Sequence, residues 1–299
     1  MRDHSLWTQL LQSRDILSLI QLSLDEDLGD GDKTTLSVFP APVLVEATIA
    51  ARTTTVVCGL PLARHIFNQL DSTIEFHPHV DEGQCLNPGE ALATVRGDVR
   101  AILSGERTVL NFLMRLCGIA TAARTATALI PPQCRARIFD TRKTTPGWRR
   151  LEKAAVAIGG AHNHRFGLFD AVLIKDNHIA AAGSIRSAIT QARLAVPSDM
   201  IVEVEIDELT QLQEALDAYP DIILLDNFSL EDLSAAVKIN SDQCELEASG
   251  GVTHESIPDI ARTGVHRISM GALTHTVVPA DLGLDMPPAP PSLPKATQS

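Results

Sequence analysis

The 299-residue sequence has no apolar run close to the roughly 18 residues that a membrane-spanning helix needs. Its first residues lack a continuous apolar segment followed by small residues, so we do not expect a secretory signal. The five cysteines are isolated and never spaced as C-x-x-C, which argues against a disulfide framework and against a zinc site. We therefore expect a cytoplasmic protein without a membrane partner, whose cysteines are small apolar core residues.

Positive charge is also scarce. The chain has 25 Lys and Arg against 37 Asp and Glu, which gives a formal net charge of -12 at pH 7. Between Arg142 and His178, however, seven cations stand against three acids. The charge of the remaining chain would repel a nucleic acid or another large polyanion. The basic stretch therefore predicts a pocket for a small, highly charged anion and no nucleic-acid partner.

The first part of the chain predicts helices mixed with a small sheet. Apolar spacing over residues 6–24 predicts one or two amphipathic helices, and the pattern over 99–130 predicts the longest helix. The acidic stretch 25–35 lacks the ligand spacing of a calcium loop, so we interpret it as a structural loop. Short β-branched runs predict strands at 43–50, 54–57, 73–77 and 91–96.

From residue 135 onward, short apolar runs alternate with helical segments. Six such repeats with continuous apolar strands imply parallel strands covered by helices. Nearly every run ends in charged or small polar residues, among them Arg142, Lys175, Glu205 and Asp226. A barrel would bring all of these strand ends to one mouth, whereas an open doubly wound sheet would not. A barrel is therefore favoured.

The expected fold class is α/β with two domains, which the chain length permits. We place an N-terminal α+β sandwich domain at residues 1–117 and a parallel β/α barrel, complete or open, at 118–276. The last segment, 277–299, is expected to be a C-terminal return segment that ends in a Pro-rich, disordered tail.

Glycines at two consecutive strand ends predict a phosphate-binding site. S-G-G at residues 249–251 and M-G-A around Gly271 would let backbone N–H groups approach a phosphate beside a helix N-terminus. Glu205 and Asp226 lie at neighbouring strand ends, where carboxylates could hold Mg²⁺ among phosphates or act as general acid and base. The cationic stretch favours the magnesium role.

A set of motifs runs in order through almost the whole chain: D-L-G-D-G-D-K-T-T, G-E-R-T-V-L-N-F-L, T-R-K-T-T-P-G, N-H-R-F-G-L-F-D-A-V-L-I-K-D-N-H, V-E-V-E, L-L-D-N-F, S-G-G and S-M-G-A-L-T-H. Together these motifs resemble the quinolinate phosphoribosyltransferase family. Ala161 and Trp148 depart from the usual Gly and Leu of that pattern, but neither change removes a charge. The resemblance implies transfer of phosphoribosyl from 5-phosphoribosyl 1-pyrophosphate to quinolinate with loss of carbon dioxide.

The resemblance also implies roles for individual residues. Arg107, which by spacing alone is half of a surface pair with Glu106, would reach the site from the second subunit of a homodimer or of a higher oligomer. The other quinolinate-binding residues would be Arg142, His164, Arg165 and Lys175. The catalytic residues would be Lys143, Glu205 and Asp226, and the two acids would hold the cofactor Mg²⁺ directly or through water. The phosphoribosyl pyrophosphate would contact Lys143, Ser249, Gly250, Gly251, Ser269, Gly271 and His275.

Other functions stay open at this point. A related transferase could use another aromatic acid, such as nicotinate. A phosphosugar aldolase or isomerase on a similar barrel would use Lys175 as a Schiff base, which requires a desolvated amine, whereas the neighbouring charges favour an ammonium. A noncatalytic binding module would not need both signs of charge at one mouth.

Overall fold

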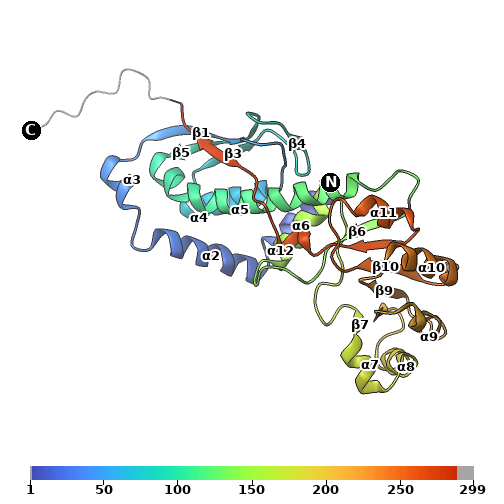
Figure 1. Ribbon diagram of the computed structural model, residues 1–299. Coiled ribbons are helices and arrows are strands. Elements are labelled where there is room, and N and C mark those ends of the chain that lie inside the picture. The colour runs from blue at the N-terminus through green and yellow to red at the C-terminus, as the bar shows by residue number, and fades with distance from the viewer. Residues whose placement is uncertain (1, 288–299) are drawn as a thin grey trace, which may run out of the picture. The chain divides into compact units, whose positions relative to one another are not determined.

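The computed structural model describes residues 2–287 (Figure 1). These residues divide into two compact units, one formed by 2–118 with 279–287 and the other by 119–278. Nearly all of the tail that the composition predicts to be disordered lies outside the described residues. None of the helices within 2–287 is both long enough and apolar enough to span a lipid bilayer.

The N-terminal unit contains an antiparallel sheet in the order β12-β1-β5-β3. The C-terminal segment supplies β12, which pairs with β1 and so joins this unit. These strands are β1 (Leu44–Ala51), β3 (Glu75–Pro78), β5 (Ala91–Asp98) and β12 (Leu282–Asp285), and the short β2 (Thr55–Val56) pairs with β4 (Cys85–Leu86).

One helix of this unit begins where the sequence offers an N-terminal signal. Gly59 takes φ +109° just before the helix that Pro61 opens, and the carboxylate of Glu82 accepts the N–H groups of Gly59 and Leu60. The capping carboxylate satisfies donors that have no partner inside the helix. The helices are α1 (Arg2–Leu10), α2 (Arg14–Leu28), α3 (Lys33–Val38), α4 (Leu60–Leu70) and the first part of α5 (Val99–Ala128).

The structure corrects the expectation of a loop at residues 25–35. Helix α2 continues to Leu28, and α3 already begins at Lys33, so only a short turn remains between them. Asp32 is the N-cap of α3, and its Oδ1 accepts the N–H of Thr35 at 2.9 Å. An acidic residue is favoured at this position because it satisfies a free N–H and complements the helix dipole. The acidic composition therefore marks a helix start.

The unit formed by residues 119–278 contains a parallel sheet of six strands in the order β6-β11-β10-β9-β8-β7. This confirms the predicted β/α architecture. Within these residues no strand pairing joins β6 to β7, so the barrel is open between them. The strands are β6 (Arg137–Phe139), β7 (Val172–Ile174), β8 (Val202–Ile206), β9 (Ile222–Asp226), β10 (Glu245–Ser249) and β11 (Arg267–Ser269).

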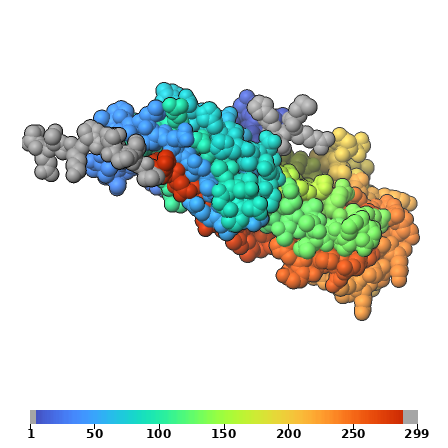
Figure 2. All heavy atoms as spheres, turned by 90° about the horizontal axis from the view of Figure 1, so that it is seen from above, coloured from blue at the N-terminus to red at the C-terminus, as the bar shows by residue number. Residues whose placement is uncertain are grey.

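Helices follow the strands of this unit and cover the outside of the sheet (Figure 1). Because β6 pairs with β11, segments more than a hundred residues apart in sequence become neighbours. Figure 2 shows this relation at the surface, where the green segment leading into β6 lies against the orange segment of the last repeats. The helices are α6 (Arg149–Gly159), α7 (Asp176–Ala182), α8 (Ile185–Ala195), η1 (Leu209–Gln211), α9 (Leu212–Leu216), α10 (Leu230–Asn240), α11 (Ile257–Arg262) and α12 (Ala272–His275).

Candidate active site

The carboxyl ends of the parallel strands carry most of the candidate site residues. Glu205 lies near the end of β8, and Asp226 and Ser249 are the last residues of β9 and β10, where they stand opposite each other in register. Lys175 follows β7 directly and is the N-cap of α7. Parallel strands present these ends at one edge of the sheet. The side chains therefore share the edge at which the sequence places them.

Two arginines near this edge have unused donors. Burial lowers the pKa of Arg165, and the neighbouring Arg142 guanidinium lowers it further, although an arginine stays charged. The Nε atoms of both residues are buried and find no hydrogen-bond partner in the described part of the chain. Arg165 Nη1 donates to the carbonyl of Ala171 at 3.2 Å. Two neighbouring guanidinium groups with open donors suit a planar carboxylate.

Lys175 forms an ion pair with Glu205 across the ends of β7 and β8. A Schiff-base lysine needs a desolvated amine, whereas the side chain of Lys175 is 44% exposed and faces a carboxylate. Asp226, on the adjacent strand, accepts a hydrogen bond from Asn227 Nδ2 at 2.8 Å. Glu205 and Asp226 thus offer hard oxygen donors at neighbouring strand ends. Such donors fit Mg²⁺, which keeps several waters and shares its coordination with phosphate oxygens.

The loop after β10 requires glycine for two different reasons. Gly250 and Gly251 have φ angles of +93° and +59°, which side chains rarely adopt. A Cβ at Gly250 would also lie 2.1 Å from Asn227 Oδ1 and 2.8 Å from the Asn227 backbone N, whereas a Cβ at Gly251 would meet nothing within 4 Å. The β10 loop therefore lies closely against the β9 loop and leaves backbone exposed at its tip.

Lys143, Gly271 and His275 come together beside this loop. A Cβ at Gly271 would lie 3.1 Å from Lys143 Cδ and 3.0 Å from His275 Cδ2. The Thr274 hydroxyl donates to the carbonyl of Lys143 at 2.8 Å, which joins the loop after β6 to α12. Ser269 differs from the other predicted phosphate contacts, because it is buried and its hydroxyl bonds the carboxylate of Glu247.

A buried ion pair that the sequence did not indicate holds the loop before Arg165. Lys153 Nζ, from α6, lies 2.6 Å from Asp140 Oδ1 and also donates to the carbonyl of His164 at 2.9 Å. Asp140 further accepts the backbone N–H of His164 and the Nδ2 of Asn163, both at 2.8 Å. Burial raises the pKa of Asp140 and lowers that of Lys153, while each charge opposes the shift of the other. The pair fixes the backbone of His164 and the side chain of Asn163.

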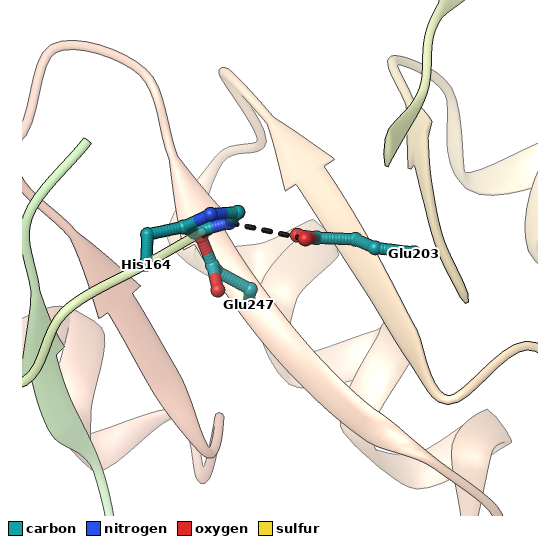
Figure 3. A group of neighbouring side chains, drawn as sticks. All are labelled: His164, Glu203 and Glu247. Atoms are coloured by element: carbon teal, nitrogen blue, oxygen red, sulfur yellow. Dashed lines mark ion pairs between the residues drawn. The ribbon is translucent and has the colours of Figure 1, made fainter. Parts of the chain in front are cut away.

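The side chain of His164 points into the barrel between two buried glutamates (Figure 3). Its Nε2 lies 3.0 Å from Glu203 Oε2 and 3.4 Å from Glu247 Oε1. Its Nδ1 accepts the backbone N–H of Arg165 at 2.8 Å. Glu247 also pairs with Arg267. Glu203 and Glu247 belong to β8 and β10, which are separated by β9 in the sheet. Side chains from alternate strands meet in one layer of a barrel interior.

The three side chains have their ligand atoms within 4.8 Å of one another, but their hydrogen bonds do not fit a metal site. A metal-bound histidine ordinarily donates a proton from its other ring nitrogen. Here Nδ1 of His164 accepts a bond, so Nε2 must carry the proton that a metal would displace. Burial lowers the pKa of His164 and the carboxylates of Glu203 and Glu247 raise it above its usual value, whereas the Arg165 N–H favours the unprotonated ring. The acceptor role of Nδ1 corresponds to the neutral ring with its proton on Nε2, whereas the raised pKa by itself would favour the doubly protonated ring.

Arg107 belongs to the N-terminal unit, where it is exposed on α5 beside the buried Thr108. The structure describes one chain, so the role of Arg107 in a second subunit stays a prediction. Asp140, Lys153, Glu203 and Glu247 are the residues to which sequence reasoning gave no role. For Glu203 one signal was present, since V-E-V-E-I places two acids on the same face of a strand that is otherwise apolar.

Two family models match the chain. "Quinolinate phosphoribosyl transferase, N-terminal domain" matches residues 32–117, and "Quinolinate phosphoribosyl transferase, C-terminal domain" matches residues 119–285. A probable nicotinate-nucleotide pyrophosphorylase [carboxylating] of Bacillus subtilis is 44% identical over 261 residues, which cover 87% of this chain and 90% of that protein. The nicotinate-nucleotide pyrophosphorylase [carboxylating] of Mycobacterium leprae is 40% identical over 273 residues, which cover 89% and 95%. The solved nicotinate-nucleotide pyrophosphorylase of Francisella tularensis has a TM-score of 0.87 and 41% identity, covering 90% of this chain and 95% of that one.

Proposed function

Because this chain belongs to the quinolinate phosphoribosyltransferase family, we propose that it transfers the phosphoribosyl group of 5-phosphoribosyl 1-pyrophosphate to quinolinate. The products are nicotinate mononucleotide, pyrophosphate and carbon dioxide, and the reaction supplies NAD biosynthesis. The observation that carries the proposal is the pair of neighbouring guanidinium groups with open donors, Arg142 and Arg165, at the strand ends that also hold acids and glycine loops.

Quinolinate is a planar ring with two adjacent carboxylates. Arg142 and Arg165 provide forked donors that match carboxylate geometry, and Lys175 adds a point charge at the same edge. Since Lys175 is paired with Glu205 in the structure, substrate binding requires the incoming anion to share the Lys175 ammonium with the Glu205 carboxylate. The second carboxylate distinguishes quinolinate from nicotinate, so the preference between them depends on these three cations.

The glycine loops and Lys143 serve the phosphoribosyl pyrophosphate. Exposed backbone at Gly250 and Gly251 suits the 5-phosphate, and Lys143 and His275 lie beside Gly271 at the neighbouring loop. The ammonium of Lys143 stabilises charge that develops on the leaving pyrophosphate. Glu205 and Asp226 would hold Mg²⁺, which supplies positive charge to the pyrophosphate oxygens when it is bound.

The bond changes follow from these positions. The bond between ribose C1 and the pyrophosphate oxygen breaks, and its electron pair leaves with pyrophosphate. The lone pair of the quinolinate nitrogen forms the new bond to C1, while a nearby carboxylate such as Asp226 stabilises the cationic character of C1. The ring nitrogen is then positively charged, so the bond from C2 to its carboxylate can break with release of carbon dioxide. The electron pair left on C2 takes up one proton.

The experiment that tests the function is quinolinate-dependent release of pyrophosphate in the presence of Mg²⁺. We expect release with quinolinate and far less with nicotinate, and equal amounts of carbon dioxide and nicotinate mononucleotide. Lys143→Ala should lower turnover by orders of magnitude at unchanged stability. Release with nicotinate but not with quinolinate would refute the assigned substrate, and near-normal turnover of Lys143→Ala would refute the role of Lys143.

We further infer a homodimer in which Arg107 of one subunit contacts quinolinate in the site of the other. The support is the family resemblance of the G-E-R-T motif and the exposed position of Arg107. A cytoplasmic location is supported by the free cysteines in the described residues, which suit a reducing compartment.

A further inference from the structure

The histidine beside Arg165 connects the barrel interior to the backbone of the anion-binding loop. The His164 side chain is 9% exposed, and both of its ring nitrogens are engaged. Nε2 faces Glu203 Oε2 at 3.0 Å, and Nδ1 accepts the N–H of Arg165 at 2.8 Å. The carboxylate of Glu203 therefore orients a ring that in turn orients the residue carrying the guanidinium.

Resting on the proposed function, we propose that Glu203 is a positioning residue that acts through the His164 ring to set Arg165 for the dicarboxylate substrate. Glu203 lies deep in β8 with 2% of its side chain exposed, so it does not itself reach the substrate. It acts as the partner that fixes the tautomer, because a carboxylate on Nε2 requires the proton there and leaves Nδ1 free to accept.

Glu247 supports the same ring from the other side. It is fully buried, lies 3.4 Å from Nε2 and is also held by Arg267. The second carboxylate disfavours a 180° flip of the imidazole. The flip would put the carbon Cε1 where Nε2 now faces Glu203 and Glu247. The remaining oxygen of Glu203, Oε1, is buried without a hydrogen-bond partner among the described residues. Within the described residues the ion-pair partner of the Glu203 carboxylate is His164, which suits a positioning role.

The loop has a second, independent anchor, which makes the proposal testable. Asp140 and Lys153 bind the backbone of His164, and Asp140 also binds the side-chain amide of Asn163. That pair does not touch the His164 ring. Replacement of Glu203 should therefore leave the loop folded and release only the side chain of His164 and the N–H of Arg165.

The test compares Glu203→Leu, Glu203→Gln and the control Glu245→Gln. Glu245 stands two residues before Glu247 on β10 and contacts Arg267 but not His164. We expect Glu203→Leu to raise the KM for quinolinate on the order of 10- to 100-fold, as a small misplacement of a binding group does. The KM for phosphoribosyl pyrophosphate should stay within about threefold. Glu203→Gln, whose amide oxygen can still accept from Nε2, should recover most of the loss, and Glu245→Gln should match the wild type.

A readout without substrate separates this proposal from the proposed function. In ¹⁵N-labelled protein, Glu203→Leu should shift the His164 ring nitrogens and the Arg165 amide, and should speed hydrogen exchange of that amide. These changes are expected even if the wild type does not use quinolinate. Failure of the wild type to use quinolinate would refute the proposed function but not the positioning role of Glu203. The positioning role is overturned if the Arg165 amide does not respond, if both KM values rise alike, if Glu203→Gln recovers nothing, or if both ring nitrogens are protonated in the active wild type.

Discussion

Lys153 Nζ and Asp140 Oδ1 lie 2.6 Å apart inside the barrel unit, with side chains 5% and 0% exposed. Breaking such a pair leaves an uncompensated buried charge, which costs about 3–5 kcal/mol. We therefore expect Lys153→Met to lower the free energy of unfolding by about that amount. Urea denaturation measures the change, with Lys238→Met, an exposed lysine in the last turn of α10, as the control.

The double variant Asp140→Asn/Lys153→Met removes both charges and should be more stable than Lys153→Met alone. The neutral amide no longer demands a counter-charge, although it still bonds the loop. Equal losses in Lys153→Met and in Lys238→Met would show that the buried pair contributes nothing specific.

The fold could be predicted because its signals are local. Each strand of the barrel is a short apolar run, and residues such as Lys175 and Asp226 follow or end these runs directly. The unusual backbone of the loop after β10 could also be predicted, because Gly250 and Gly251 mark conformations that other residues rarely adopt.

The buried interactions inside the site could not be predicted, because tertiary structure alone brings the interacting side chains together. Lys153 sits in an ordinary helical segment, 13 residues after Asp140, and nothing in that spacing indicates burial. The contact of His164 with Glu203 joins a loop to a strand 39 positions later. The identity of the aromatic substrate came from family motifs, since composition and spacing indicated only a small anion.

Gly250 and Gly251 allow a matched comparison of clash and backbone strain. Both have positive φ, but only a Cβ at Gly250 would collide, at 2.1 Å from Asn227 Oδ1. Gly251→Ala should lower the free energy of unfolding by about 1 kcal/mol, the usual effect of strain. Gly250→Ala should lower it by more than about 2 kcal/mol, because the β9 loop must also move. Thermal or urea unfolding distinguishes them, and equal losses would contradict the close contact of the two loops.

Asp170 should contribute to stability in a pH-dependent manner. Burial raises the pKa of its carboxyl, but the N–H groups of Phe166 and Gly167, at 2.6 and 2.8 Å, bring the pKa below its usual 3.8. A carboxyl whose folded pKa is depressed contributes stability above the unfolded value, and that contribution is lost as pH falls through the folded value. From pH 5 downward, Asp170→Asn should therefore lose stability less steeply than the wild type.

Urea unfolding between pH 5 and pH 2.5 checks this expectation. Asp176→Asn, which removes an exposed carboxylate outside the loop, should keep the wild-type slope. Parallel slopes for Asp170→Asn and the wild type would show that the carboxylate does not hold residues 166 and 167.

Removal of either predicted magnesium ligand should change the metal requirement. Asp226→Asn should raise the Mg²⁺ concentration for half-maximal pyrophosphate release by about tenfold or more, because a neutral amide oxygen is a weaker ligand than a carboxylate. Glu205→Gln should act in the same direction and also free Lys175 from its ion pair. Asp207→Asn, exposed just beyond β8, is the control. An unchanged Mg²⁺ dependence in both variants would assign the metal to other residues.

The proposed shared dimer site predicts complementation between two inactive variants. Arg107→Ala and Lys143→Ala should each have little activity, for Arg107 would serve the partner's site and Lys143 its own. After subunit exchange of an equal mixture, half of the dimers are mixed, and each mixed dimer contains one site with neither change. About a quarter of the wild-type activity should therefore return. In a control mixture of Arg142→Ala with Lys143→Ala, every site keeps one change and no activity should return. If differently tagged subunits exchange and the first mixture still stays inactive, Arg107 does not act across subunits.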